Sequence, residues 1–572
     1  MPIDAAGGVW GTGVDAELSG VGERAVPRRA VLGGPRSGWA ELGAVVGLIT
    51  GAGLAARASA SPPEIAIDAD PGSLVHALVN RVTFGFTEVE LADANMRGYD
   101  GYLDRQLDHQ SITEDPALTA RLSALQTLSY TGQQLYDTSL VNNSSQIVNE
   151  LTEAVIVRAV YSKRQLFERM VEFWNDHFNI DITQDEQRYL KTLDDRTNRQ
   201  FAMTTFGQLL SASAHSPAML AYLDNDQSSN GNINENYARE LIELHTVGAD
   251  YFYAYPQAEV QATIVAVARC FTGWGWRTGS YNDTTPGGTG TSLRATFFYN
   301  SGTIRNGVRI NGTTVTGIRA GIHDTGSKVL GTLFGSAVIP AGRTGAAGEQ
   351  DGQDVLDMLA AHPATAAYIA GKLCRRFLGE GVSQATIDSV RDAYLNPSNP
   401  QGVGDIRAML KVMLSPQNMA NAFPRFKRPF HLFVSAMRTL PVTITSTSTL
   451  RTRLSAAGHA QFAWTSPDGY PDTTEYWTGQ VLPRWSFCAS LATTSSGNAG
   501  GISGIVIDDA AFFSGATTPA AVIDRLNQSL FGGLMPTADK TLVQGTLSAT
   551  PSAVQRRDAI GLALASPAFQ WY

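Results

Sequence analysis

The sequence has few cysteines, and this scarcity excludes two classes of small protein module. Its three cysteines, Cys270, Cys374 and Cys488, lie far apart and form no CxxC pair. This spacing excludes a zinc ribbon and a disulfide scaffold, although one disulfide bond stays open in an oxidising compartment. Two of the cysteines lie in apolar helical contexts, so we favour buried free thiols.

The sequence also has no excess of basic over acidic residues. Lys and Arg total 43 against 52 Asp and Glu, which gives a formal net charge of -9. A dedicated nucleic-acid-binding protein normally has a basic surface, so we expect no nucleic-acid partner. A local basic segment is still present at Arg425, Lys427 and Arg428.

Several catalytic signatures are absent from the sequence. It contains no G-x-S-x-G motif, P-loop, Rossmann fingerprint or HExxH zinc motif. Beyond the N-terminal segment, no stretch approaches the roughly 18 apolar residues of a membrane span. We therefore expect a mature chain without a transmembrane helix.

The N-terminal segment has the three parts of an export signal in order. The pair Arg28-Arg29 is followed by a weakly apolar stretch over residues 42–56 and then by Ala58-Ser59-Ala60. Twin arginines, a modest apolar region and a small-x-small site resemble a twin-arginine (Tat) signal. The alternative is a chance arginine pair in a disordered leader. We expect a periplasmic or secreted protein.

The remaining composition indicates a folded chain with a large core. Of its 572 residues, 43% are hydrophobic and only 17% are charged, which is typical of globular proteins. A chain of this length exceeds the size at which single cores stop growing. We therefore expect two or more subdomains.

Capping signals and hydrophobic periodicity predict a mainly α fold with a multi-helical body. Asp70-Pro71 and the pair Thr87 and Glu90 are typical helix starts, the second helix ending near Gly98. Residues 146–178 read as helical for many turns without Pro or Gly. Further helices are expected over residues 234–247 and 256–271.

A glycine- and threonine-rich segment interrupts this helical pattern. Residues 277–348 alternate in hydrophobicity around Asn311-Gly312, which is a strong hairpin signal. We therefore divide the chain into a leader (1–60), an N-terminal helical part (61–276), a small β- and loop-rich insertion (277–348) and a C-terminal helical part (349–572).

Seven segments together resemble one bacterial family, domain-of-unknown-function family 1800. They are His76-Ala-Leu-Val-Asn80-Arg81-Val-Thr-Phe-Gly85, Phe173-Trp174-Asn-Asp-His177-Phe178, Asn234-Glu-Asn236-Tyr-Ala-Arg239-Glu240-Leu-Ile-Glu243-Leu-His245-Thr-Val-Gly248, Phe271-Thr-Gly273-Trp274, His323-Asp324-Thr-Gly-Ser-Lys328, His362-Pro363-Ala-Thr-Ala and Ser466-Pro-Asp-Gly-Tyr-Pro471. The resemblance covers nearly all of the mature chain and implies an exported, helix-rich protein. It implies no accepted catalytic residues. The insertion is longer than the family pattern suggests.

A helical projection at about 100° per residue gives the candidate catalytic residues. One side of the 234–247 helix carries Asn236, Arg239, Glu240 and Glu243. We expect this side to line a cleft that faces the loop containing His323 and Asp324, since loops on a rigid scaffold often carry function. Local ion pairs of Arg239 with the two glutamates are the simpler alternative.

The same projection separates carboxylates from histidines. Glu168, Glu172 and Asp176 share one helix face, for which a solvated surface is the simplest interpretation. His177 and His245 fall in apolar stripes, so we expect buried rings on helices that pack together. Buried core histidines are the simpler interpretation. If the two meet His323 or His362, the cluster would hold a divalent metal ion as cofactor.

Three functions remain open at this point. The first is an exported hydrolase or lyase that acts on an extracytoplasmic polymer, with Glu240 or Glu243 working beside His323 and Asp324. The second is a metal-binding protein built on the buried histidines. The third is a non-catalytic envelope or surface-assembly protein. The tryptophans Trp274 and Trp276 suit a sugar platform, although core packing at a helix end is more common.

Overall fold

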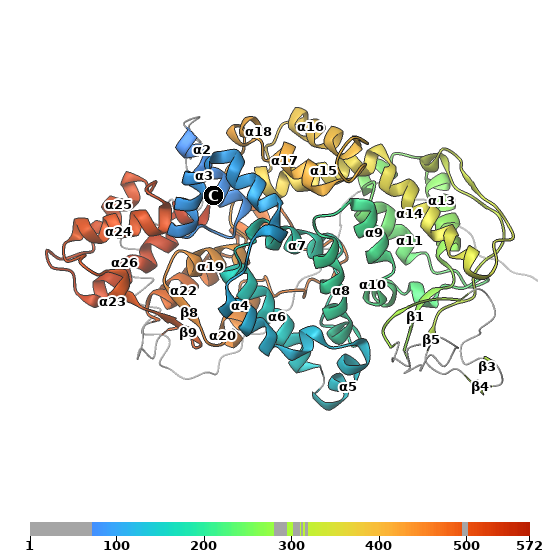
Figure 1. The fold of residues 1–572 in the computed structure, drawn as a ribbon, viewed down its shortest axis with the longest axis horizontal. Coiled ribbons are helices and arrows are strands. Elements are labelled where there is room, and N and C mark those ends of the chain that lie inside the picture. Colours follow the sequence, from blue (N-terminus) through green and yellow to red (C-terminus); the bar gives the residue numbers. More distant parts are fainter. Residues whose placement is uncertain are drawn as a thin grey trace, which may run out of the picture. The chain divides into compact units, whose positions relative to one another are not determined.

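The computed structural model describes residues 71–142, 144–278, 294–300, 309–310, 313–314, 318–494 and 501–572. All of them belong to the compact unit that residues 49–572 form. The leader expected over residues 1–60, including Arg28-Arg29, lies outside the described residues, as does Asp70. The described part is mainly α-helical with a few short strands (Figure 1), which confirms the predicted fold class.

The N-terminal helical part runs to Phe271. Its elements are α2 (Pro71–Val82), α3 (Glu88–Leu107), η1 (His109–Ser111), α4 (Pro116–Ala124), η2 (Gln126–Ser129), α5 (Gly132–Asn142), α6 (Ser145–Tyr161), α7 (Gln165–His177), α8 (Gln187–Phe201), α9 (Phe206–Ala214), α10 (Pro217–Tyr222), η3 (Asn225–Gln227), α11 (Asn236–Glu240), the π-helix η4 (Leu241–His245), α12 (Ala249–Phe252) and α13 (Gln257–Phe271). Thr87 caps α3 by accepting from the Glu90 amide, as predicted. The chain leaves the helical conformation at Gly98, as predicted. That glycine has a φ of 72°, which kinks the chain, and helix resumes to Leu107.

The long helix predicted over residues 146–178 is two helices, α6 and α7. Ser162 ends α6 in an extended conformation, and its hydroxyl accepts from the Arg164 amide. The Gln165 side chain donates to the carbonyls of Ala159 and Ser162. Side-chain bonds to the backbone therefore replace helical bonds at this break, although no Pro or Gly marks it.

Short strands form in and around the predicted insertion. They are β1 (Trp274–Arg277), β2 (Phe297–Tyr299), β3 (Arg309–Ile310), β4 (Thr313–Thr314), β5 (Ile318–Arg319), β6 (Lys328–Val329) and β7 (Val338–Ile339), with the 3-10 turns η5 (Thr332–Phe334) and η6 (Gly345–Gly348). An antiparallel sheet has the order β2-β1-β5. The pair β3 and β4, with Ile310 opposite Thr313, confirms the hairpin predicted at residues 311–312.

Helices resume in the C-terminal part. The elements are α14 (Gln350–Ala361), α15 (Pro363–Leu378), α16 (Gln384–Leu395), α17 (Ile406–Met413), α18 (Pro416–Ala420), α19 (Pro429–Arg438), β8 (Val442–Ile444), α20 (Ser448–Ala456), α21 (Thr474–Thr478), α22 (Val481–Ala492), β9 (Ile505–Ile507), α23 (Asp509–Phe512), α24 (Pro519–Phe531), α25 (Thr537–Gln544), α26 (Ala553–Ala565) and α27 (Pro567–Gln570). Strands β8 and β9 pair antiparallel. Pro363 begins α15 in the predicted first position, and His362 caps it.

One hydrophobic cluster joins helices from several parts of the sequence. It runs from Val75 in α2 to Met419 in α18, and it includes residues of the insertion such as Leu330. Helix α7 lies in the middle of this arrangement (Figure 1), and most of its residues are buried. The three cysteines are buried free thiols, as expected.

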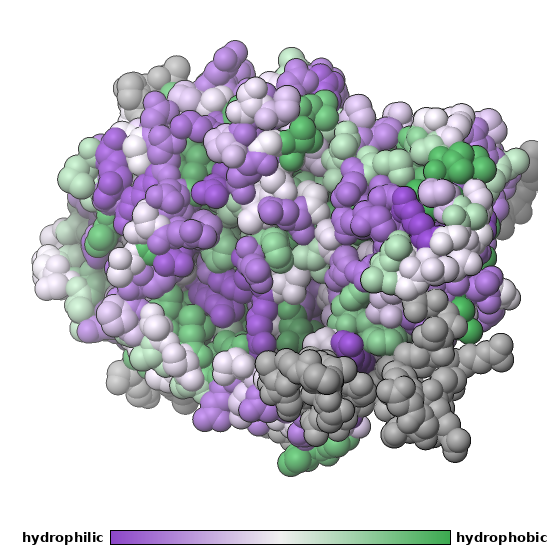
Figure 2. All heavy atoms as spheres, turned by 45° about the vertical axis from the view of Figure 1, so that its right-hand side comes forward, coloured by the Kyte–Doolittle hydropathy of each residue, from purple (hydrophilic) through white to green (hydrophobic). Residues whose placement is uncertain are grey.

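Hydrophilic and hydrophobic side chains are mixed on the surface. On the face shown in Figure 2, hydrophilic residues are interspersed with smaller hydrophobic areas. Among the described helices, none has both the length and the apolar character needed to cross a membrane.

Candidate functional site

The carboxylate face of α7 lines a cavity that is partly open to solvent, with an empty space of about 590 Å³ when the adjoining solvent is included. Glu168, Glu172 and Asp176 lie on this face, as the projection predicted, but it is not the solvated surface that we considered simplest. Glu168 is only 8% exposed, and residues from α6, α8, α19 and the segment 459–470 close the cavity over the helix. Buried charges need partners, so the contacts of these carboxylates define the site.

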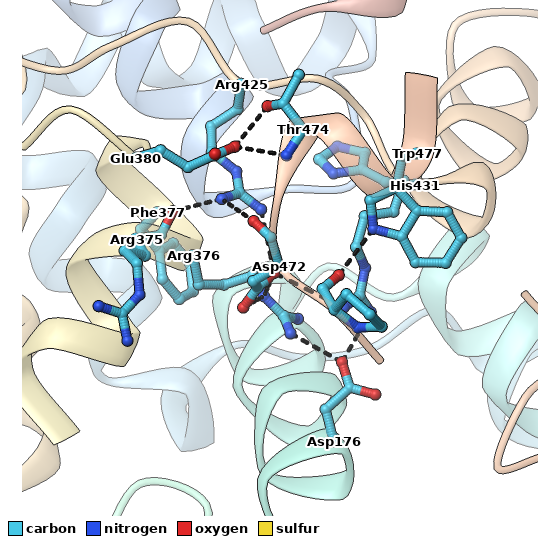
Figure 3. A network of polar contacts seen from close by, with 12 residues as sticks. Asp176, Arg375, Arg376, Phe377, Glu380, Arg425, His431, Asp472, Thr474 and Trp477 are labelled. Atoms are coloured by element: carbon cyan, nitrogen blue, oxygen red, sulfur yellow. Dashed lines mark hydrogen bonds and ion pairs between the residues drawn. The ribbon is translucent and has the colours of Figure 1, made fainter. Parts of the chain in front are cut away.

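A buried ion network holds the C-terminal end of this face. Arg428 contacts Glu172 and Asp176 at 2.9 and 2.8 Å. Arg376 contacts Asp176 at 2.8 Å and Asp472 at 2.7 Å. Asp472 lies at the centre of the network, between Arg425 and Asp176 (Figure 3). Burial raises the pKa of Asp472, but Arg376, Arg425 and Arg428 outweigh it and hold that pKa well below its usual range.

A close approach of two backbones fixes the loop that carries Asp472. Gly469 has a φ of +77°, and a Cβ built there would lie 2.1 Å from the carbonyl oxygen of Asp176. The Asn179 side chain donates to the carbonyls of Trp464 and Ser466 at 2.9 and 2.7 Å. The segment 466–471, one of those that carry the family resemblance, therefore packs directly against the end of α7.

The other end of the cavity is closed by a second set of paired charges. Arg199 makes a bidentate contact with Glu168, at 2.7 and 2.8 Å. Asn175 donates to Asp195 at 3.1 Å, and Arg158 lies 3.8 Å from the same carboxylate. Bidentate arginine–carboxylate pairs are among the stronger charged contacts in proteins. These pairs make this end of the cavity a rigid wall.

Charges at the cavity nearly balance. Two aspartates and two glutamates line it against two arginines, Arg199 and Arg428. Arg158, Arg169 and Arg376 pack behind the carboxylates within ion-pair distance. His459 also lines the cavity, and burial together with the charge of Arg428 lowers its pKa well below the usual value. The ring is therefore neutral, and little net charge is left for a ligand.

Unused hydrogen-bonding atoms remain at this cavity. In the described part of the chain, three lining residues each have a buried polar atom without a hydrogen bond: Glu172 Oε2, Arg428 Nη1 and Gln461 Nε2. The set includes donors and an acceptor. Buried polar atoms in native proteins usually have a partner, so each of these needs an explanation. The aromatic rings of Phe84, Phe430, Phe462 and Tyr470 line the same space.

The predicted catalytic residues of the 234–247 segment form a separate surface group. Arg239 lies 3.6 Å from both Glu235 and Glu243, and it donates to the Tyr253 hydroxyl at 3.2 Å. Glu240 is half-buried, and burial together with the Glu243 charge raises its pKa. Asn236 is exposed. The local ion pairs that we set against catalysis are therefore present.

His323 and Asp324 have other partners than those expected. His323 Nδ1 lies 2.7 Å from the Thr272 carbonyl oxygen, and Nε2 lies 3.3 Å from Asp351. Arg269 binds Asp324 at 2.7 Å. Among the described residues, no hydrogen bond or ion pair joins this loop to Glu240 or Glu243. The expected facing arrangement is therefore not found, because buried charges nearer to the loop pair with it.

The two candidate metal ligands do meet, as the projection predicted. His177 and His245 are each 1% exposed, with ring centroids 6.1 Å apart. Burial lowers the pKa of both, that of His245 to about 3. However, no group of three or more His, Cys, Asp or Glu side chains in the described ranges could hold a metal ion. The predicted metal cluster does not form, because His323 binds Asp351 and His362 accepts from the Ala364 amide as a helix cap.

Two further expectations need correction. Trp274 and Trp276 are 0% and 1% exposed, so neither offers a platform for sugar stacking. Both belong to strand β1, and the Trp274 ring packs against the Phe297 ring. Arg425, Lys427 and Arg428 are not a basic surface patch either, because all three are at most 5% exposed.

Sequence reasoning missed several residues of the cavity. His459 lines the cavity, whereas Arg376 and Asp472 belong to the ion network behind it. The three come from distant segments, and no local pattern joins them. One usable signal was present: three carboxylates on one face of a strongly apolar helix, together with basic residues 425–428 that find no acidic neighbours in sequence. Charges that cannot be solvated must pair, so the two groups could have been matched.

Comparison with known proteins gives the family. The family model for a protein of unknown function (DUF1800) matches residues 77–571, which confirms the resemblance seen in the sequence. Nothing among curated proteins or solved structures matches the chain. Since the match covers most of its length, the chain belongs to the DUF1800 family.

Proposed function

We propose that this protein binds a neutral, hydroxyl-rich polymer, a polysaccharide, in the cavity over α7. One observation carries the proposal: buried donors and an acceptor without hydrogen bonds line the same space as four aromatic rings. Ligand pockets typically combine apolar walls with a few well-placed polar groups. Sugar hydroxyls donate and accept, and sugar C–H faces pack on aromatic rings.

Charge supports a neutral ligand. Each carboxylate at the cavity has a guanidinium within 4 Å: Glu168 has Arg199, Glu172 and Asp176 have Arg428, and Asp195 has Arg158. A charged ligand would have to displace one of these partners and leave a buried charge unpaired, which is strongly unfavourable. A sugar needs no such exchange.

The ion pairs of these carboxylates also bear on whether the cavity binds a sugar or cleaves it. Glu172 Oε2 has no hydrogen bond and could accept a proton, so the cavity offers a general base. Hydrolysis of a glycosidic bond also needs a carboxylic acid that donates a proton to the leaving oxygen. Ion-paired carboxylates are poor proton donors. The geometry therefore supports binding better than the hydrolase or lyase activity expected from the sequence, and the assay below tests both.

We also propose that the polymer is extracytoplasmic. The support is the N-terminal order of Arg28-Arg29, a weakly apolar stretch and Ala58-Ser59-Ala60, which is typical of a Tat signal. Proteins exported by this route are folded before they cross the membrane, as the resemblance implies. A cavity held by buried ion pairs is compatible with such transport.

Isothermal titration of the full chain with maltohexaose, cellohexaose and chitohexaose tests the binding proposal. We expect at least one to bind, and Gln461→Leu to weaken that binding about fivefold, the value of one net hydrogen bond. Gln461 makes no hydrogen bond in the described part of the chain through Nε2, so its replacement should spare the fold. Gln417→Leu, on the exposed helix α18, is the matched control.

Two results would contradict the binding proposal, and a third would favour hydrolysis. If no hexaose binds, or if both glutamine variants bind equally well, the cavity is not the sugar site. Release of shorter sugars on incubation, lost in Glu172→Gln at unchanged melting temperature, would restore the hydrolase interpretation.

A further inference from the structure

A second cavity lies away from α7, between α2 and the C-terminal helices. It is partly open to solvent, and its empty space together with the adjoining solvent is about 750 Å³. Helix α2 contributes Ser73, His76, Ala77, Asn80 and Arg81, which include the first segment of the family resemblance. The opposite wall is mainly apolar, with Phe531, Leu534, Pro536, Ala568 and Trp571. None of the residues that line it is an aspartate or a glutamate.

Arg81 is the charged residue of this cavity, and it lacks a carboxylate partner. Its side chain is 2% exposed and donates to the carbonyl oxygens of Phe377 and Phe423, at 3.1 and 2.6 Å. These bonds use two of the five guanidinium N–H groups. No ion pair of Arg81 occurs within the described ranges. Buried arginines are normally paired with an anion, so this positive charge is uncompensated.

Neighbouring charges add to the positive potential at Arg81. Burial lowers the pKa of Arg81 to about 10; the nearby Tyr572 phenol acts in the opposite direction, and Arg425 and Arg169 lower the pKa further. Those two arginines have carboxylates of their own, Glu172 and Asp472. Burial lowers the pKa of His76 to about 4, so this ring is neutral and adds no charge. Within the described ranges, Arg81 thus has no aspartate or glutamate as partner, and the weakly acidic Tyr572 phenol is the group beside it.

The Tyr572 phenol responds to this potential. Arg81 lies over its ring at 5.0 Å from the centroid, and Arg169 donates to its hydroxyl at 3.2 Å. Burial raises the pKa of Tyr572, but Arg169, Arg425 and Arg81 outweigh it and lower the value to about 8. A site that favours phenolate favours other anions too.

We propose that this cavity binds an amphipathic carboxylate, with the carboxylate against Arg81 and an aliphatic chain along the apolar wall. Planar guanidinium groups fit carboxylates in geometry as well as charge. The wall from Phe531 to Trp571 contributes the hydrophobic part, since burial of aliphatic carbon in an apolar cavity is favourable.

Calorimetric titration of the full chain at pH 7 with decanoate, decanol and acetate tests this proposal. Decanoate has both the charge and the chain, whereas decanol lacks the charge and acetate lacks the chain. We expect decanoate to bind at least about tenfold more tightly than either, since a charged hydrogen bond and a buried chain each contribute more than about 1.4 kcal/mol. Equal binding of decanoate and decanol would overturn the role of Arg81.

Variants locate the binding. Ala77→Trp fills the cavity from α2 and should abolish decanoate binding, whereas Ala92→Trp, at an exposed site on α3, should leave it unchanged. Arg81→Gln should abolish it too, but this variant also loses two backbone contacts. Decanoate binding that survives Ala77→Trp in a folded protein would place the ligand elsewhere and refute the proposal.

Tyr572 supplies a readout that does not depend on those variants. Phenolate absorbs near 295 nm, and subtraction of the Tyr572→Phe spectrum isolates this residue. A bound carboxylate disfavours phenolate, so we expect decanoate to move the Tyr572 midpoint upward, and decanol to leave it in place. An unchanged midpoint at saturating decanoate would refute the site beside Arg81.

Discussion

The two cavities differ in how their arginines are compensated. Over α7, each lining carboxylate has a guanidinium partner, and the arginines of the network share those acids. In the second cavity, Arg81 is buried with carbonyl oxygens for partners, and no acidic residue lines the space. The presence or absence of a carboxylate partner thus decides which ligand a buried arginine can accept. Hydrogen-bonding atoms without partners favour a sugar in the cavity over α7, and the charge of Arg81 favours an anion in the second cavity.

This contrast also separates two roles of buried charge in the fold. Arg428, Arg376 and Asp472 join α7, α15 and the loop before α21, so the network ties distant segments together. Arg81 joins α2 to the carbonyls of residues 377 and 423 without using an acid. Loss of a charge should therefore affect stability differently at the two places.

The largest effect is expected for Arg428→Met. It leaves Glu172 and Asp176 with a buried negative charge that only Arg376 and the more distant Arg169 can compensate, and breaking one partner of a buried pair costs about 3–5 kcal/mol. Urea unfolding followed by circular dichroism measures the loss. Arg391→Met, in a surface pair with Asp388, is the control and should leave the midpoint unchanged. Equal midpoints for the two variants would mean that the network does not stabilise the fold.

A smaller loss is expected for Arg81→Gln. The variant removes charged hydrogen bonds to two carbonyls and leaves no buried carboxylate behind, so we expect a loss of about 1–3 kcal/mol in the same urea experiment. A loss as large as that of Arg428→Met would show that Arg81 has an acidic partner after all, and the distinction between the cavities would fail.

Titration of Tyr572 tests the positive potential at the second cavity directly. With a folded pKa of about 8 and an unfolded value of 10.0, the phenol stabilises the fold fully above pH 10. This contribution is lost as the pH falls through 8. Relative to Tyr572→Phe, the wild-type free energy of unfolding should therefore rise between pH 8 and 10. A constant difference between the two proteins across this range would contradict a depressed pKa.

Sequence patterns predicted elements better than they predicted the site. The cap at Thr87, the hairpin around residues 311–312 and the burial of His177 and His245 depend on local spacing, and the structure confirms them. The break at Ser162 was missed because side chains, not Pro or Gly, end α6 there. Local sequence signals determine where a helix begins and ends only where tertiary contacts agree with them.

The candidate site was harder to predict because it is assembled from segments far apart in the chain. Asp176 pairs with Arg376, 200 positions away, and with Arg428. The projection placed Glu172 and Asp176 on one face but could not say whether solvent or arginine covers it. Glu240 and Glu243 were favoured for their local density of polar groups, which proved to be a network within one surface segment. Their catalytic role stays a prediction.

The smallest effect is expected from removal of the leader. The two cavities are lined only by residues from Ser73 onward. The chain that begins after residue 60 should therefore melt within about 1 °C of the full chain, since this corresponds to about 1 kcal/mol for a protein of this size. Its binding of hexaose and of decanoate should be unchanged.

Arg28→Lys with Arg29→Lys should instead block export, measured by fractionation of the producing cells, while leaving both binding reactions intact. Loss of either binding reaction on truncation would show that the leader contributes to that cavity, and unchanged export of the double variant would count against the Tat signal.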